Sequence, residues 1–187
     1  MSLFNKEEYT EALNKGEAEI FHTFVMKCTF VAKCGRPDSL TGISYLSTKV
    51  LNPCKEDMTK LTKIVSYLQN SIDICLTLEA GDIRKFAWYK DSSFGTHGGV
   101  KSHTGGIMTL EKGSILADST KQKLNRRSLT EAELMAVDDK ISKKIWIKCF
   151  LEHQGFKPIP NILHQDNQST IKLQENGKES SGKRTRL

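Results

Sequence analysis

The sequence predicts an α/β protein, in which a small helical segment precedes a mixed sheet built in the order β-β-β-α-β-α. Residues 1–82 carry apolar side chains at spacings of three and four, which is typical of helices. From residue 83, short apolar runs bounded by turn residues predict strands, and one long stretch predicts a crossover helix. We therefore expect two domains, residues 1–82 and residues 83–187.

The first half predicts three helices, over residues 19–34, 38–51 and 55–70. Gly35 and Pro37 break the first helix, and the second stops at Pro53. The expected buried stripes are Phe21, Phe24, Val25, Cys28 and Val31 on the first helix, and Met58, Leu61, Ile64, Val65 and Leu68 on the third. This half has no catalytic pattern, so packing and nucleic-acid contact are its expected roles.

The second half predicts a sheet with a crossover helix. The expected strands are residues 84–91, 105–111, 114–119 and 160–166, with a hairpin turn at Lys112-Gly113. A long helix from Ser128 to about His153 ends before Gly155, and a short one covers residues 167–176. The buried stripe expected on the long helix is Leu134, Val137, Ile141, Ile145 and Cys149. The crossover should return the fourth strand beside the first.

The composition favours a polyanionic partner. Lys and Arg number 28 against 22 Asp and Glu, a net charge of +6. The cations gather in two clusters, KQKLNRR (residues 121–127) and the last ten residues, although solvated loops are the alternative for each. No apolar run is long enough to span a membrane and no secretory signal is present. The five cysteines form no C-x-x-C pair, which indicates reduced thiols in an intracellular protein.

Three acids occupy special positions in this predicted fold. Asp91 ends the first strand, Asp166 ends the fourth, and Glu133 lies in the first turns of the long helix. Each acid alone could be a cap or a surface charge, but Glu131 already has the capping-box spacing from Ser128 and leaves Glu133 without a local role. Adjacent strands would bring the three carboxylates together, and such a cluster needs a cation. Mg²⁺ prefers oxygen ligands of this kind, and a pair of ions would align an attacking water and a leaving oxygen.

Some histidines and aromatic residues have two interpretations. His97 and His103 bracket a glycine-rich turn, where exposed loop histidines are expected and a metal pair is the alternative. Tyr89 and its neighbour Trp88 belong either to the core or to a surface that stacks on bases. His164 shares the Asp166 face of its strand by period-two alternation.

Several blocks of the chain resemble a known family. The ribonuclease H domain of copia-type LTR retrotransposons is closely similar to the blocks WYKDSSFGTH, SHTGG, STKQKLNRRSLTEAELMAVDD and HQDNQSTIKLQENGKESSGKRTR. The upstream segment, residues 21–73, looks like the part of the same polyprotein that joins reverse transcriptase to that domain. The resemblance covers nearly the whole chain and implies a ribonuclease H-like fold within a fragment of the Pol polyprotein.

The resemblance also implies an activity and a set of site residues. In the family pattern the metal-binding, catalytic acids fall on Asp91 in YKDSS, Glu133 in AELMA and Asp166 in QDNQS. The implied reaction is cleavage of the RNA strand of an RNA–DNA hybrid with Mg²⁺, for which Mn²⁺ can substitute. Nucleic-acid contacts are implied for Lys121, Arg126, Arg127, Asn167, Gln168, Ser169, Lys183 and Arg184.

Two departures from the family pattern lead to an alternative function. The pattern continues past KRTR to a position that supplies or supports a fourth metal ligand, and the chain stops at Leu187 before it. The chain also has no Y-x-D-D motif, so we expect no reverse transcription from it alone. The alternatives to a nuclease are a non-catalytic nucleic-acid-binding remnant, and a structural fragment that folds poorly alone. The expected partners are the hybrid and the rest of the polyprotein, in a cytoplasmic virus-like particle or in the nucleus, without a membrane.

Overall fold

The computed structural model describes residues 11–82, 85–97, 101–123, 129–157, 162–164 and 166–176. The chain forms two compact units. The helical unit ends at Thr77 and also takes in Ala117–Lys121, whereas the sheet unit contains Leu78–Leu116 and the chain from Gln122 onwards. Each unit has an apolar core of its own.

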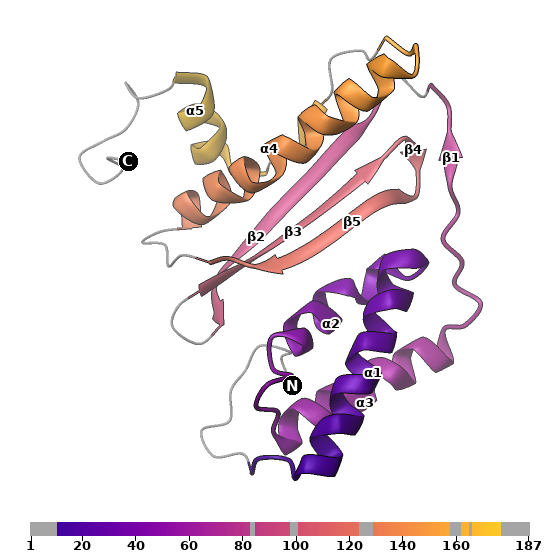
Figure 1. Ribbon diagram of the computed structural model, residues 1–187. Helices are drawn as coiled ribbons and strands as arrows, with labels where there is room; N and C mark the ends of the chain where they lie inside the picture. The colour runs from indigo at the N-terminus through magenta and orange to yellow at the C-terminus, as the bar shows by residue number, and fades with distance from the viewer. Residues whose placement is uncertain are drawn as a thin grey trace. The chain divides into compact units, whose positions relative to one another are not determined.

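The helical unit contains three helices, drawn in indigo to magenta in Figure 1. They are α1 (Lys15–Cys34), α2 (Leu40–Ser47) and α3 (Lys55–Asn70), and a short 3₁₀ helix, η1 (Pro37–Ser39), precedes α2. A capping box starts α1, because Glu17 N donates to Asn14 Oδ1 (2.9 Å) and Asn14 N donates to Glu17 Oε2 (3.0 Å). The bounds predicted for α3 are confirmed, but α2 ends at Ser47 instead of continuing to residue 51.

The core of this unit uses the predicted stripes in part. Buried residues from all three helices form it: Phe21, Val25, Cys28, Ile43, Tyr45, Leu46 and Leu61. The remaining four residues of the predicted α3 stripe pack against this cluster. Phe24 and Val31 of α1 were wrongly predicted to be buried and are exposed. They lie on the edge of the α1 stripe, and two neighbouring helices cover only part of the circumference of a third.

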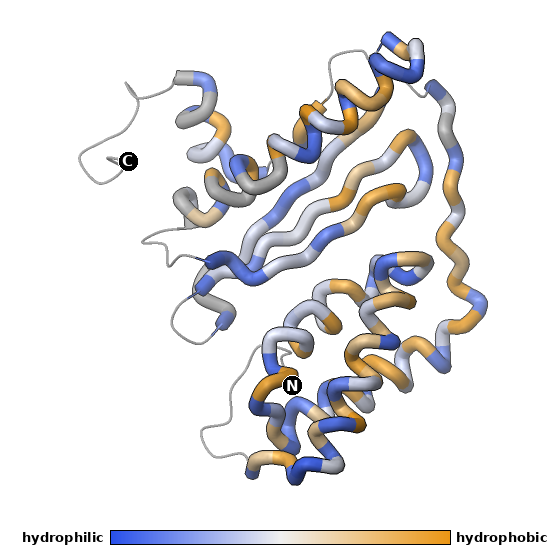
Figure 2. The backbone as a smooth tube through the Cα atoms, viewed as in Figure 1, coloured by the Kyte–Doolittle hydropathy of each residue, from blue (hydrophilic) through white to orange (hydrophobic). Residues whose placement is uncertain are grey.

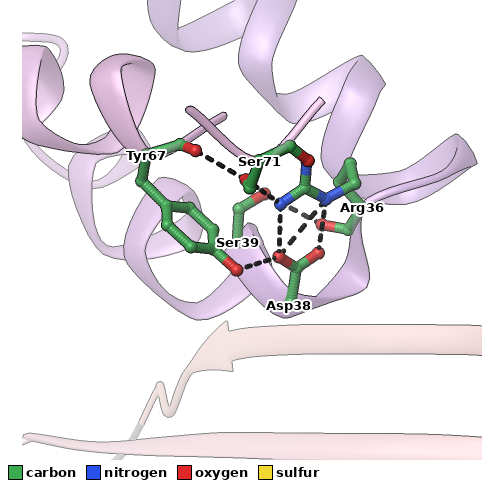
Figure 3. A network of polar contacts seen from close by, with 5 residues as sticks. All are labelled: Arg36, Asp38, Ser39, Tyr67 and Ser71. Carbon is green, nitrogen blue, oxygen red and sulfur yellow. Dashed lines mark hydrogen bonds and ion pairs between the residues drawn. The ribbon is translucent and has the colours of Figure 1, made fainter. Parts of the chain in front are cut away.

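A polar network joins the start of η1 to the end of α3 (Figure 3). Arg36 donates to both carboxylate oxygens of Asp38 and also to the carbonyl and hydroxyl oxygens of Ser71. Tyr67 donates its hydroxyl hydrogen to Asp38 Oδ2 at 2.6 Å. These bonds hold the pKa of Asp38 at about 2, below its usual range, chiefly through Arg36 and then through Tyr67.

The sheet unit is built on a four-stranded mixed sheet. Its strand order is β5 (Ser114–Lys121), β3 (Lys101–Thr109), β2 (Ala87–His97) and β6 (Ile162–His164). β3 is antiparallel to β2, whereas β6 is parallel to β2. The helix α4 (Leu129–His153) makes the crossover, and α5 (Gln168–Asn176) follows β6. The predicted α/β order and the return of the fourth strand beside the first are therefore confirmed.

The hairpin between β3 and β5 carries a small extra ladder. β4 (Glu111–Lys112) pairs antiparallel with β1 (Glu79–Ala80). Gly113 has a φ of 71°, which a glycine adopts without strain, so the predicted turn at Lys112-Gly113 is confirmed. Among the described residues, no helix has the length and apolar character needed to cross a membrane.

The first two strands extend further than predicted. β2 continues to His97, whereas the sequence predicted its end at residue 91. β3 begins at Lys101, whereas the sequence predicted its start at residue 105. His97 and His103 are buried in these extensions, with Nε2 of the first 2.8 Å from Nδ1 of the second. The prediction of exposed loop histidines is wrong, because pairing between the strands turns both rings towards each other.

The long helix α4 lies along β2, with α5 beside its N-terminal half (Figure 1). It ends in a Schellman motif: Phe156 N donates to Leu151 O, Gly155 N donates to Glu152 O, and Gly155 has a φ of 86°. The predicted stop at Gly155 is confirmed. Leu151 joins Phe86, Trp88 and Met108 in the core of this unit.

The buried face of α4 differs from the predicted stripe. Ile141, Ile145 and Cys149 are exposed, whereas Glu133 and Leu151 are buried. Successive helix residues are about 100° apart, so this face is turned by roughly one residue from the predicted one. Figure 2 shows that the polarity of the sheet changes along its strands: β3 and β5 are apolar towards the β4 turn and polar at their other ends.

Candidate metal centre

Two of the predicted acids lie in or just after neighbouring parallel strands. Tyr89 of β2 and His164 of β6 are register partners, and their rings stack with centroids 4.5 Å apart. Asp91 follows the first of these residues by two positions and Asp166 follows the second by two. Asp91 lies inside β2, which continues to His97, so the prediction that this acid ends the first strand is wrong. Asp166 lies two residues beyond the last residue of β6.

The third acid reaches this place from the second turn of α4. Glu133 is only 2% exposed, and its Oε1 accepts a hydrogen bond from Ser92 N at 3.1 Å. Ser92 is the next residue after Asp91 on β2, so the bond ties the glutamate directly to the strand that carries the first aspartate. Burial of a carboxylate is costly, which makes this position an unusual one for an acid.

The three carboxylates converge. Asp91, Glu133 and Asp166 each offer an oxygen, and these atoms all lie within 4.8 Å of one another. Such a set of carboxylate oxygens, two exposed and one buried, fits a hard divalent cation such as Mg²⁺. Without a cation the three negative charges would repel one another at this distance. The donor set therefore fits the ion that the sequence predicted.

A cavity of about 670 Å³ adjoins the carboxylates. Its lining includes Tyr89, Asp91, His164, Asp166, Ile171 and Glu175. The neighbouring Trp88 is buried in the core, as the first interpretation of these aromatics predicted, whereas Tyr89 is 44% exposed. The two exposed aspartates thus line this cavity.

The predicted nucleic-acid contacts are only partly described. Asn167 caps α5, because its Oδ1 accepts from Thr170 N at 3.1 Å, and Gln168 and Ser169 are exposed in the first turn of that helix. Lys121 is the half-buried last residue of β5. The remaining predicted contacts, Arg126, Arg127, Lys183 and Arg184, lie outside the described residues, as does the proposed cap at Ser128.

Sequence reasoning missed three polar residues that hold α4 on the sheet. Lys90 Nζ donates to Val137 O (3.3 Å), Ser92 N donates to Glu133, and Gln122 Nε2 donates to Ala132 O (2.9 Å). Lys90 and Ser92 share the buried face of Trp88 by alternation, and polar residues on a buried face are the signal that could have revealed them. The polar end of the sheet unit is therefore organised around Glu133.

Comparison with known proteins defines the class. The Pol polyprotein of the retrovirus-related transposon TNT 1-94 from Nicotiana tabacum is 31% identical over 143 residues, which is 76% of this chain and 11% of that protein. The Gag-Pol polyprotein of transposon Ty1-JR2 from Saccharomyces cerevisiae is 28% identical over 142 residues, 74% of this chain and 8% of that protein. No protein-family model matches the chain, and no solved structure matches it.

The relatives of this chain are thus retrotransposon Pol polyproteins. More particularly, the chain is homologous to a segment of such a polyprotein, of the copia type that the sequence predicted. It spans about a tenth of the length of the curated relatives that it matches.

Proposed function

We propose that the sheet unit is a ribonuclease H-like, metal-dependent endonuclease that cuts the RNA strand of RNA–DNA hybrids. The observation that carries this proposal is the convergence of Asp91, Glu133 and Asp166, whose carboxylate oxygens lie within 4.8 Å of one another. The mixed sheet with a parallel fourth strand supports it, because this topology places the two aspartates side by side. Homology to retrotransposon Pol polyproteins supports it from a second direction.

The three acids have different tasks in this proposal. Asp91 and Asp166 are exposed at the cavity, where a phosphodiester group would approach. Glu133 is buried and held by Ser92 N, so its oxygen keeps a constant position relative to Asp91. Mg²⁺ bound by these residues would neutralise charge on the reacting phosphate and orient the attacking water.

The substrate would be recognised mainly through its backbone. Gln168 and Ser169 are exposed in the first turn of α5, immediately after Asp166, where helix N–H groups favour an anionic phosphate. Such contacts do not depend on base sequence. The 2′-hydroxyl of the cleaved strand would distinguish RNA from DNA.

Cleavage of a labelled RNA–DNA hybrid by the purified chain tests the proposal. We expect cleavage with Mg²⁺ or Mn²⁺ but not with EDTA, and none of the corresponding DNA duplex. Asp91→Asn should reduce the rate at least about 100-fold, because it removes a ligand. Asp138→Asn is the matched control, since Asp138 is an exposed acid of α4 outside the triad.

The cleavage and binding results together distinguish a nuclease from a non-catalytic nucleic-acid-binding protein. A folded wild-type chain that cleaves no hybrid, like its Asp91→Asn variant, would refute the nuclease proposal. Binding of the hybrid with a steep salt dependence but without cleavage would instead identify a non-catalytic nucleic-acid-binding protein.

A further inference from the structure

Gln122 connects three parts of the sheet unit. It directly follows β5 and is buried, and its backbone N donates to Ser102 O at 2.8 Å. Its side-chain Nε2 donates to Thr104 Oγ1 of β3 and to Ala132 O of α4, each at 2.9 Å. A side-chain amide has two N–H donors, and both are used in this arrangement.

The orientation of this amide follows from its partners. A backbone carbonyl can only accept a hydrogen bond, so the nitrogen of the Gln122 amide must face Ala132 O. The amide oxygen, Oε1, is buried and has no hydrogen-bond partner among the described residues. Burying an unpaired acceptor is unfavourable. Gln122 therefore contributes to the structure through its two N–H donors. An apolar side chain would fill the same space without burying an unpaired acceptor.

The bond to Ala132 acts at the end of α4 that is remote from the apolar cluster of this unit. Ala132 directly precedes Glu133, whereas the apolar cluster of this unit contacts α4 at Ile147 and Leu151, several turns away. The first turns are held by Gln122, together with the bonds from Ser92 to Glu133 and from Lys90 to Val137. Of these three bonds, the one from Gln122 joins α4 to β3.

We infer that Gln122 is a positioning residue for the carboxylate triad. Its amide fixes the start of α4 against β3, and this sets how far Glu133 reaches towards Asp91 and Asp166. The functional part of this inference rests on the proposed metal-dependent function, whereas the anchoring of α4 can be tested separately. Groups that hydrogen-bond to a metal ligand itself commonly change metal affinity 10- to 100-fold when they are removed. Gln122 acts through the backbone next to Glu133, so we expect the lower end of this range.

Hydrogen exchange measured by mass spectrometry tests the anchoring. Gln122→Met keeps the length of the side chain and removes both donors, and Gln122→Glu keeps the shape and replaces donors with acceptors. We expect exchange across residues 129–137 to rise about tenfold in both variants, with little change around Leu151. Leu151→Ala is the matched control, because it weakens the other end of the same helix and should give the reverse pattern. Unchanged exchange over residues 129–137 in both Gln122 variants would overturn the inference.

Mn²⁺ titration, followed by electron paramagnetic resonance, tests the consequence for the triad. We expect the Kd for Mn²⁺ to rise about 10-fold in Gln122→Met and to change less than about threefold in Leu151→Ala. Equal Mn²⁺ affinity in wild type and Gln122→Met would refute the positioning role while leaving the proposed function intact. If the wild type binds no Mn²⁺, the proposed function fails, and the exchange experiment still decides whether Gln122 anchors α4. Thr104→Val, which removes one of the two acceptors, provides a milder variant should those at position 122 fail to fold.

Discussion

Glu133 and Leu151 lie on the same face of α4, about five turns apart, and both are buried against the sheet. The carboxylate is 2% exposed and the leucine 8%. One end of the helix is held by hydrogen bonds around the acidic triad, and the other end by an apolar cluster. The acidic triad and the apolar cluster are therefore at opposite ends of one helix, and each can be perturbed separately.

Glu133→Gln should stabilise the protein in the absence of metal. The amide keeps an oxygen that can accept from Ser92 N, while the repulsion from Asp91 and Asp166 disappears. We expect a gain of about 1 kcal/mol in the free energy of unfolding without Mg²⁺, and loss of most of the stabilisation that Mg²⁺ provides. Thermal unfolding in EDTA, and then at Mg²⁺ concentrations raised in tenfold steps, measures both the stability without metal and the stabilisation by Mg²⁺. A variant that is less stable than wild type in EDTA would contradict the expected repulsion between Glu133 and the two aspartates.

Leu151→Ala should destabilise the sheet unit by about 2–4 kcal/mol, because it opens a cavity beside Phe86, Trp88 and Met108. The chain has two tryptophans, Trp88 and Trp146, and both belong to this unit. Urea unfolding followed by tryptophan fluorescence therefore reports the sheet unit selectively. Ile145→Ala is the matched control on the exposed side of α4 and should cost less than about 0.5 kcal/mol. Similar losses in the two variants would contradict the observed rotation of the helix.

Asp38→Asn should destabilise the helical unit by about 1 kcal/mol, because it weakens the hydrogen bonds from Arg36 and Tyr67. The folded pKa of Asp38, about 2, lies below its ordinary value, so this stabilisation is complete above about pH 4 and is lost as the pH falls towards 2. The difference between wild type and variant should narrow over that window when unfolding is followed by circular dichroism. The exposed acid Asp73 offers a control as Asp73→Asn. A difference that persists at pH 2 would refute the assignment to this carboxylate.

The buried His103 should make the free energy of unfolding depend on pH in a range above that of Asp38. Burial lowers its pKa to about 4, below the ordinary value of 6.5, so the folded state favours the neutral ring. Stability from this group is complete above about pH 6.5 and decreases by at most about 1.4 kcal/mol per pH unit as the pH falls towards 4. Tryptophan fluorescence during urea unfolding at pH 7.5, 6 and 5 measures the slope. His103→Gln should flatten it, and an unchanged slope in this variant would assign the effect to other groups.

Much of the fold could be predicted because its signals are local. The helix α3 has its five apolar residues at regular spacing, and Gly113 and Gly155 mark a turn and a helix end that require their backbone freedom. The order of strands and helices then limits the topology, since a crossover helix returns its strand parallel to the first. Glu133 and Asp166 could be named for the same reason, because each lies close to an element boundary. Asp91 was named at a predicted strand end but lies inside β2.

The rotation of α4 could not be predicted from its apolar pattern. Counting apolar residues placed Ile141 and Ile145 inside, yet the buried face is centred on Glu133 and Leu151. Hydropathy gives a buried carboxylate no weight, whereas in the folded chain Ser92 N donates to Glu133 and Gln122 Nε2 donates to the adjacent Ala132 O. These two donors are 41 and 10 residues away in sequence from the residues that they hold.

Local chain chemistry thus sets which segments become helices and strands. Long-range hydrogen bonds set the depth and rotation at which α4 meets the sheet. The physical reason is that backbone propensity acts over a few residues, while the satisfaction of a buried polar group depends on whatever the fold brings within 3 Å of it. Glu133 illustrates both the local and the long-range effects. Its position in the sequence predicted a candidate site, and its hydrogen bond from Ser92 N shows how its carboxylate is held.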